Sequence, residues 1–224
     1  TTKAFTAAAL GTLVDQGKLK WDDRVVDHWP EFRMSDPWVT NEIRISDLLA
    51  NHSGLSEVAE EIWYGTDFNR GELIERLANV PITEGFRYQF QYRNVMFLAA
   101  GQLIPRITSG TSWDDYVKTA LFTPLKMDRS TTKLEEVAKY TNLAKPHLLD
   151  YQLNPLPVPY RNIDNIAPAG SIMSTAKEMG NWIRMLTMNG AFGGKTIIKP
   201  ETLAFIERSQ TPVSTVGPGG KPLS

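Results

Sequence analysis

The first fourteen residues constrain the fold of this chain more than any other stretch. They read Thr-Thr-Lys-Ala-Phe-Thr-Ala-Ala-Ala-Leu-Gly-Thr-Leu-Val and are rich in the strong helix formers Ala and Leu. Phe5, Ala8, Ala9 and Leu13 recur at the spacing that lines one helical face. We therefore expect a buried helix. Because a natural chain rarely begins inside such a run, we also expect residue 1 to be a cut or a limit of order rather than a true start.

The composition indicates a globular protein and narrows its partners. Hydrophobic types make up 42% of the 224 residues, enough for the core of one ordinary domain or two small ones. The formal net charge is −1 with both signs mixed, which disfavours nucleic acid and anionic membrane surfaces. No apolar run approaches the roughly 18 residues of a membrane span. With no Cys and three scattered His, disulfides and a Cys nucleophile are excluded and a zinc site is disfavoured.

Periodicity and capping residues predict further helices. We expect them after Ser46, which would be an N-cap, over 68–79 up to Pro81, over about 92–107, after the N-cap Ser112, over 174–188 with Ser174 as cap, and over 200–207. The first helix should end near Gly17, which suits a left-handed C-cap. Residues 141–169 lack periodicity, and so long a loop suggests a function such as the wall of a site. From Thr211 onward the Gly/Pro-rich sequence predicts a loop.

Five motifs occur in an order that carries a family resemblance. They are the Thr-Thr-Lys run at the start, Val-Asp-Gln-Gly-Lys-Leu at 14–19, Ile-Ser-Asp-Leu-Leu-Ala-Asn-His-Ser-Gly-Leu at 45–55, Tyr92-Arg93-Asn94, and Pro-Ala-Gly-Ser-Ile-Met-Ser-Thr at 168–175. In this order and spacing they closely resemble the serine β-lactamase-like hydrolases, which include class C β-lactamases, penicillin-binding DD-peptidases and related esterases and peptidases. The resemblance runs nearly end to end. It implies an α/β fold with a large helical region, β-lactamase/transpeptidase-like, of which this fragment is mostly α.

The resemblance also implies how the chain is divided. Residues 1–224 would be part of one β-lactamase-like catalytic domain, in which about 20–170 form the helical, inserted region. Residues 1–19 and 171–224 would be helices of the α/β region, and the sheet strands would lie largely outside the fragment. The nucleophilic Ser would directly precede Thr1, and a Lys-Thr-Gly or His-x-Gly motif would follow Ser224. Lys195-Thr196 lacks the Gly and is interpreted as a turn-flanked surface segment. A periplasmic or secreted location is favoured by resemblance only.

Acyl transfer by a Ser hydroxyl requires a base, a proton donor for the leaving group and an oxyanion hole. A Ser before Thr1 would complete an S-x-x-K motif, in which residues three apart share a helical face. Lys3 would then hold its amine one turn from the nucleophile, where burial and the positive helix end both disfavour the charged form, so that Lys3 could act as base. Without the resemblance, a solvated Lys near a helix end is the more ordinary interpretation.

By resemblance, Tyr92 is the hydroxyl that shuttles protons between nucleophile and leaving group, and Asn94 donates to Lys3 and to the substrate's amide. Their i, i+2 spacing aims both side chains into one cleft in a loop but separates them in a regular helix, so the motif should precede the helix. The ordinary alternatives are a half-buried aromatic for Tyr92 and a helix N-cap for Asn94. The motif predicts that Lys3, Tyr92 and Asn94 converge within hydrogen-bonding range at the N-terminus of the first helix.

Other polar and aromatic residues are weaker candidates. His52 and Ser53 are interpreted as a structural turn, because neighbours in sequence rarely meet as nucleophile and base. His28 and His147 are interpreted as surface or packing residues. Candidates for contact with the substrate or for a substrate wall are Glu84, Phe86, Tyr88, Phe90, Tyr160, Arg161 and Asp164, although aromatics at such spacing more often belong to a core.

We therefore expect a serine hydrolase that forms an acyl-enzyme on an ester, amide, peptide or β-lactam, with no metal or organic cofactor and a small molecule or peptide as partner. Esterase or peptidase activity is favoured over dedicated β-lactamase activity, because Arg93 stands where Ala or Ser is more usual. One alternative is a non-catalytic relative that binds peptidoglycan-like ligands or a partner. The other is an N-terminal Thr hydrolase, which is disfavoured because such a Thr usually opens a strand rather than a helix.

Overall fold

The computed structural model describes residues 1–211, which form helices joined by loops, together with two small β-hairpins. The helical elements are α1 (Thr2–Asp15), α2 (Val25–His28), α3 (Pro37–Glu42), α4 (Ile45–Ala50), α5 (Val58–Glu61), α6 (Arg70–Arg76), η1 (Leu77–Asn79), α7 (Asn94–Ile107), α8 (Trp113–Val117), η2 (Lys118–Phe122), η3 (Leu134–Lys139), η4 (Asp164–Ile166), α9 (Ala167–Gly170), α10 (Ala176–Thr187) and α11 (Pro200–Glu207). None of these helices is long and apolar enough to cross a bilayer.

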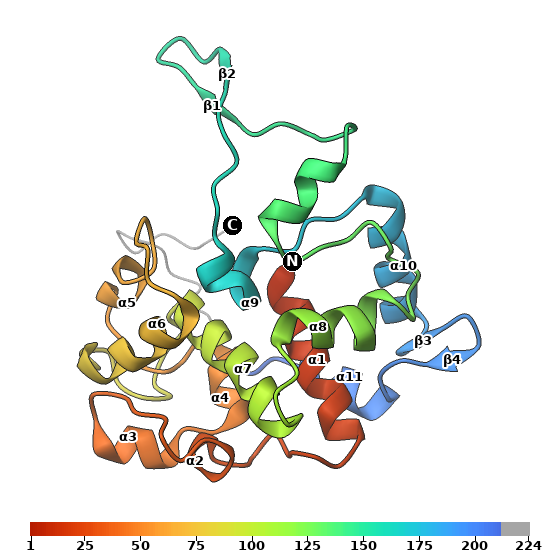
Figure 1. The fold of residues 1–224 in the computed structure, drawn as a ribbon. Helices are drawn as coiled ribbons and strands as arrows, with labels where there is room; N and C mark the ends of the chain where they lie inside the picture. Colours follow the sequence, from red (N-terminus) through yellow and green to blue (C-terminus); the bar gives the residue numbers. More distant parts are fainter. Residues whose placement is uncertain (212–224) are drawn as a thin grey trace, which may run out of the picture.

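The two hairpins lie outside the core. Strands β1 (His147–Leu149) and β2 (Pro155–Pro157) pair antiparallel, with Leu148 opposite Leu156. Strands β3 (Ala191–Phe192) and β4 (Lys195–Thr196) pair in the same sense. Figure 1 shows α1 at the centre of the helical body and the β1–β2 hairpin standing away from it. The described part of the chain is therefore mostly helical, as the sequence predicts.

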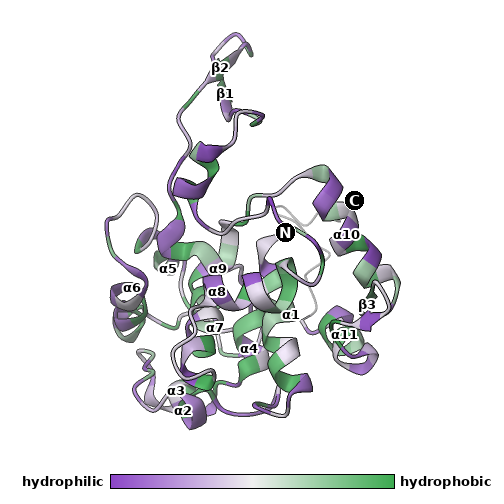
Figure 2. Cartoon of the chain, turned by 45° about the vertical axis from the view of Figure 1, so that its right-hand side comes forward, coloured by the Kyte–Doolittle hydropathy of each residue, from purple (hydrophilic) through white to green (hydrophobic). Residues whose placement is uncertain are grey.

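Helix α1 is the centre of the core because nearly all of its surface is apolar or small. Phe5, Ala9, Leu10 and Leu13 are completely buried. The Phe5 ring stacks on Trp182 of α10 with 3.9 Å between ring centroids. Helices α7, α8, α9 and α11 all contact α1. Figure 2 shows hydrophobic colours concentrated along α1 and α7, as expected for helices that are covered on most sides.

The predicted end of the first helix is confirmed. Gly17 has φ +68° and lies in the left-handed region, which glycine adopts without strain. The N–H of Lys18 donates to the carbonyl of Leu13 at 3.0 Å, and the N–H of Gly17 donates to that of Val14 at 2.9 Å. These bonds satisfy carbonyls of the last turn that have no partner within the helix.

Hydrogen bonds between residues distant in sequence fix the start of α1 to the segment that contains α9. The hydroxyl of Thr6 donates to the carbonyl of Pro168 at 2.6 Å, and that of Thr2 accepts from the N–H of Ile172 at 3.1 Å. Gly101 of α7 lets α9 come close, since a Cβ there would lie 2.4 Å from Cγ of Pro168. Residues 168–172 are therefore held between α1 and α7.

Several other helix predictions are confirmed. Ser112 caps α8 by accepting from the N–H of Asp115 at 3.0 Å. Helix α11 spans the predicted residues 200–207. The helix predicted over 68–79 is α6 continued by η1, and it begins at Arg70 because the side chain of Asn69 caps it. Val80, before Pro81, is extended with ψ 120°, which ends the helical stretch.

The predicted cap of α4 is wrong. The helix begins at Ile45, one residue before Ser46, and Arg44 is its N-cap. The carboxylate of Asp47 accepts from the N–H of Arg44 at 2.7 Å. An acid at the third helical position thus satisfies the backbone of the capping position, and the serine is left inside the helix.

The predicted cap of α10 is wrong by one residue. The hydroxyl of Thr175 accepts from the N–H of Glu178 at 3.2 Å, so Thr175 is the cap. Ser174 instead shares a hydrogen bond with Ser130 at 2.7 Å. The Glu178 carboxylate accepts from Ser130 rather than from the backbone of the cap, so no capping box forms at this helix.

Residues 141–169 do not form one structureless loop. They contain the β1–β2 hairpin, η4 and most of α9. The hairpin is open to solvent, with 64% of Leu148 and of Leu149 exposed. Residues 161–165 line a pocket of the body. The loop predicted from Thr211 onward lies, apart from Thr211 itself, outside the described residues.

Candidate active site

The amine of Lys3 is the centre of a polar cluster at the first turn of α1. Its Nζ donates to Oδ1 of Asn94 at 2.6 Å and to the carbonyl of Ala169 at 3.0 Å. The cluster therefore joins three helices, α1, α7 and α9, whose residues are far apart in sequence. The side chain of Lys3 is partly buried and points into the molecule rather than into solvent.

Asn94 is the first residue of α7 and is fixed on both sides of its amide. Its Nδ2 donates to Oε2 of Glu60 at 2.6 Å, and its backbone N–H donates to Oε1 of the same carboxylate at 2.6 Å. The alternative role of N-cap is wrong, since Arg93 holds that position. The expected direction of one bond is also reversed: Nζ of Lys3 donates and Oδ1 of Asn94 accepts.

Tyr92 lies just before α7 and meets Lys3 with its ring. Nζ of Lys3 is 4.6 Å from the centroid of the Tyr92 ring and 5.3 Å from that of Phe97. Half of the Tyr92 surface is exposed. Within residues 1–211 its hydroxyl makes no hydrogen bond, so the predicted hydrogen-bonding convergence is observed between Lys3 and Asn94 and not at Tyr92.

The middle residue of the Tyr-Arg-Asn motif explains how the outer two side chains come to face one cluster. Arg93 is buried, and its Nε donates to the carbonyl of Leu55 at 2.9 Å. Its backbone N–H donates to Oδ1 of Asn51 at 3.1 Å. Because side chains alternate in an extended backbone, Arg93 turns toward the 51–55 turn while Tyr92 and Asn94 turn away from it. The helix predicted over about 92–107 begins at Asn94, so Tyr92 precedes it as expected from the motif, whereas Asn94 is already its first residue.

Glu60 of α5 is the member of the cluster that the sequence did not indicate. Besides its two bonds from Asn94, its Oε2 accepts from Nε1 of Trp63 at 2.9 Å. Glu60 lies 34 positions before Asn94 in a stretch with three acids among residues 57–61, and no spacing rule separates it from its neighbours. Its role is visible only in the fold, where its carboxylate faces the first backbone N–H of α7.

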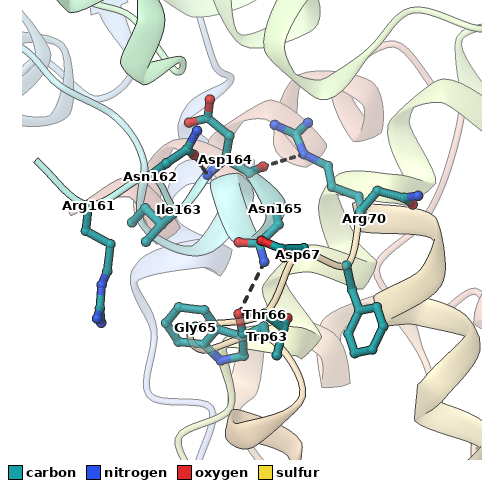
Figure 3. Close-up of a pocket in the computed structure, with 12 residues that line it drawn as sticks. Trp63, Gly65, Thr66, Asp67, Arg70, Arg161, Asn162, Ile163, Asp164 and Asn165 are labelled. Atoms are coloured by element: carbon teal, nitrogen blue, oxygen red, sulfur yellow. Dashed lines mark hydrogen bonds between the residues drawn. The ribbon is translucent and has the colours of Figure 1, made fainter.

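A pocket of about 500 Å³ lies beside this cluster and shares Trp63 with it. Figure 3 shows how residues 63–70 form one wall and residues 161–165 the other. Nδ2 of Asn165 donates to the carbonyl of Trp63 at 3.2 Å, which ties the two walls together. Trp63, Asp67 and Arg161 give the pocket an aromatic surface and charges of both signs, which suit a polar small molecule.

Arg70 anchors the same pocket to the body. Its Nε donates to the carbonyl of Asp164 at 2.8 Å, and its Nη1 pairs with Oδ2 of Asp114 at 2.5 Å. Burial raises the pKa of the Asp114 carboxyl, but the hydrogen bonds and charge of Arg70 outweigh burial and hold that pKa below its ordinary value. The carboxylate of Asp114 therefore stays ionised and holds Arg70 in place.

A second, smaller hollow of about 260 Å³ touches Lys3 itself. Its walls come from α1, α4, α7 and α11 and are mainly apolar. The residues that line it are Lys3, Ala4, Ala7, Trp21, Ser46, Leu49, Phe97, Phe205, Ile206 and Gln210. Lys3 thus borders an apolar hollow, while its amine binds the Asn94 amide.

The weaker candidates have mostly structural contacts. Of the residues suggested as a substrate wall, Arg161 and Asp164 line the larger pocket. The Tyr160 hydroxyl donates to the carbonyl of Ala144 at the base of the hairpin. Glu84 accepts from Gln89 and Arg93, Phe86 packs on Trp38, Tyr88 and Phe90 are exposed, and His147 lies in the exposed hairpin.

The interpretation of His52 and Ser53 as a structural turn agrees with their surroundings. His52 Nε2 bonds Oδ1 of Asp47 at 2.7 Å, and Ser53 is completely buried. Arg87 also pairs with Asp47, at 2.6 Å. His28 likewise bonds a carboxylate, that of Asp23, at 2.9 Å. Among residues 1–211 no three or more His, Asp or Glu side chains are arranged to hold a metal ion.

Comparison with known proteins identifies the family. The chain belongs to the Beta-lactamase family, whose family model matches residues 1–221. The solved structure of the octameric penicillin-binding protein homologue from Pyrococcus abyssi superposes on this chain with a TM-score of 0.77 at 24% sequence identity. The superposed part covers 99% of this chain and 50% of that chain. The chain therefore has a β-lactamase/transpeptidase-like fold, represented here mainly by helices.

Curated relatives are similar over most of the chain. Unguisins hydrolase ungD' of Aspergillus campestris is 31% identical over 198 residues, which is 83% of this chain and 36% of that protein. Penicillin-binding protein 4 of Amycolatopsis lactamdurans is 28% identical over 215 residues, 93% of this chain and 55% of that protein. The chain thus spans about half or less of the length of these relatives.

Proposed function

We propose that this chain is part of a serine hydrolase that works through an acyl-enzyme on an ester, amide, peptide or β-lactam. The observation that carries the proposal is the position of Lys3. Its amine is held by Asn94 and Ala169 at the first turn of the central helix, beside the ring of Tyr92. A family whose members include a hydrolase and a penicillin-binding protein supports the same chemistry.

In this proposal the nucleophile is a Ser in the position directly before Thr1, one helical turn from Lys3. The Ser Oγ forms a bond to the substrate carbonyl carbon while Lys3 accepts the hydroxyl proton. Tyr92 passes the proton to the leaving oxygen or nitrogen as its bond to carbon breaks. A water molecule then attacks the ester so formed, which releases the acid and returns the proton to the Ser. Asn94 holds Lys3 and offers the second hydrogen of its NH₂ group to the substrate.

The division of the chain is part of the same proposal. Residues 1–224 belong to one catalytic domain, with about 20–170 as its helical region and with 1–19 and 171–224 as helices of its α/β region. The packing of α1 against α11 supports the placement of these two helices in one region. In this proposal the strands of the sheet lie largely outside the fragment.

Removal of the Lys3 amine tests this function. In the protein expressed from its complete gene, Lys3→Ala should lower kcat/KM for an activated ester by about a hundredfold or more, because a positioned base contributes roughly 10²–10⁴ to such rates. Lys18→Ala, at an exposed position after the same helix, is the matched control and should leave the rate unchanged. Equal rates in wild type and Lys3→Ala, at comparable melting temperature, would rule out Lys3 as the base.

A further inference from the structure

The carboxylate of Glu60 determines which way the Asn94 amide points. A carboxylate has only acceptors, so the group of Asn94 that faces it must be the NH₂. The Asn94 oxygen is then the group left to face Lys3, whose amine, as a base, can both donate and accept and so does not select the orientation itself. The 2.6 Å contact with Glu60 therefore fixes one orientation of the amide, in which the oxygen lies 2.6 Å from Nζ of Lys3.

The Glu60 carboxylate is itself fixed. Oε1 accepts from the backbone N–H of Asn94, and Oε2 accepts from the Asn94 NH₂ and from Nε1 of Trp63. These are three hydrogen bonds from rigid groups, two of them at the start of α7. A carboxylate that is bound in this way orients its partner, here the Asn94 side chain, rather than reacting itself.

We propose that Glu60 is a positioning residue, which keeps the Asn94 oxygen directed at the Lys3 amine during acyl transfer. This inference rests on the proposed function. Glu60 acts through Asn94 and does not touch the reacting atoms. Without the Glu60 carboxylate, a neutral Lys3 amine, which can both donate and accept, would tolerate either orientation of the Asn94 amide.

Glu60→Gln tests the proposal because glutamine cannot accept at both of its atoms. If the oxygen of the introduced glutamine faces the backbone N–H of Asn94, the glutamine NH₂ faces the Asn94 side chain. This arrangement favours the flipped Asn94 amide, which turns a donor toward Lys3. In the opposite orientation, the glutamine NH₂ faces the backbone N–H of Asn94, so that two donors meet. Loss of such a supporting partner typically lowers activity about 10–100-fold. The decrease should appear in kcat more than in KM.

Asn94→Asp supplies a readout that a merely structural role would not change. In the Glu60→Gln background, the carboxylate introduced at position 94 accepts both from the amide introduced at position 60 and from Lys3, so kcat on a simple acetate ester should recover about fivefold or more. With Glu60 intact, the same change places two carboxylates together, and kcat should fall. The effect of Asn94→Asp on kcat is thus opposite in sign in the two backgrounds, Glu60 and Glu60→Gln.

Glu61→Gln, an exposed neighbour on α5, is the matched control and should retain wild-type kcat.

The outcomes separate the two proposals. If the wild type hydrolyses the ester and Glu60→Gln does so equally fast, or if Asn94→Asp is harmful in both backgrounds, the role of Glu60 is refuted while the hydrolase stands. If the wild type does not hydrolyse the ester, the proposed hydrolase function is refuted, and NMR then tests the orientation of the Asn94 amide separately. The side-chain NH₂ signal of Asn94, identified by its loss in Asn94→Asp, should then exchange slowly with water in wild type and faster in Glu60→Gln. Equal exchange would overturn the inference.

Discussion

At the scale of single residues, Asp47 illustrates how a carboxylate can stabilise the turn beneath the site. It is 4% exposed and accepts from His52, from Arg87 and from the N–H of Arg44. Burial raises the pKa of the Asp47 carboxyl, but these hydrogen bonds and the Arg87 charge outweigh burial and hold that pKa below its ordinary value of 3.8. The folded state therefore binds its proton less readily than the unfolded chain does.

This pKa gives Asp47 a stability contribution that depends on pH. A group whose pKa is lower in the folded state than in the unfolded chain stabilises the fold at pH values above its unfolded pKa. This stabilisation is lost as the pH falls through the folded pKa. Asp47→Asn should cost about 3 kcal/mol at pH 7, because it leaves Arg87 and His52 without their carboxylate. The difference in unfolding free energy from wild type should shrink as pH falls below 3.8.

Urea denaturation at several pH values measures this difference. Asp128→Asn, at an exposed position, is the control and should match wild type throughout. A cost of Asp47→Asn that stays constant from pH 7 to pH 3 would contradict the assignment of the lowered pKa to Asp47.

At the scale of elements, the close packing of α7 and α9 depends on Gly101. A methyl group there would overlap the ring of Pro168, which has no flexible end to move aside. Gly101→Ala should therefore destabilise the protein by about 1–3 kcal/mol, in spite of the better helix propensity of Ala. It should also lower the hydrolysis rate, because α9 carries the Ala169 carbonyl that accepts from Lys3.

Gly180 in α10 provides the control for this substitution. A Cβ at Gly180 meets nothing within 4 Å, so Gly180→Ala should raise the stability by about 0.5–1 kcal/mol and leave activity unchanged. Thermal denaturation and ester hydrolysis measure both effects. If Gly101→Ala were as stable as Gly180→Ala, the two helices would not be in the close contact described.

The elements also show what the sequence predicts well. The long helices α1, α7 and α10 were predictable because periodicity and stop signals act locally, as Gly17 demonstrates. Their exact starts were less predictable. At α10 two neighbouring hydroxyls compete for the cap, and Ser174 is drawn to Ser130 on a distant segment. The β1–β2 hairpin has no alternation of apolar and polar residues, since both of its faces are exposed.

At the scale of the whole molecule, the candidate site exists only in the assembled fold. Lys3 binds Asn94, 91 positions away, and Ala169, 166 positions away. Family motifs predicted the meeting of Lys3 and Asn94. No motif indicated Glu60, because its role depends on where α5 lies relative to α7. The direction of the Lys3–Asn94 bond was likewise beyond the sequence, since it follows from the donors and acceptors that surround the amide.

The central claim is that Lys3 serves a serine nucleophile one turn before it. Intact-mass and peptide mapping after reaction with a fluorophosphonate or penicillin probe tests this claim most directly. In the protein from its complete gene, the account predicts one adduct per chain, located on a Ser directly before Thr1 and strongly reduced in Lys3→Ala. No adduct, or an adduct at another residue that persists in Lys3→Ala, would contradict it.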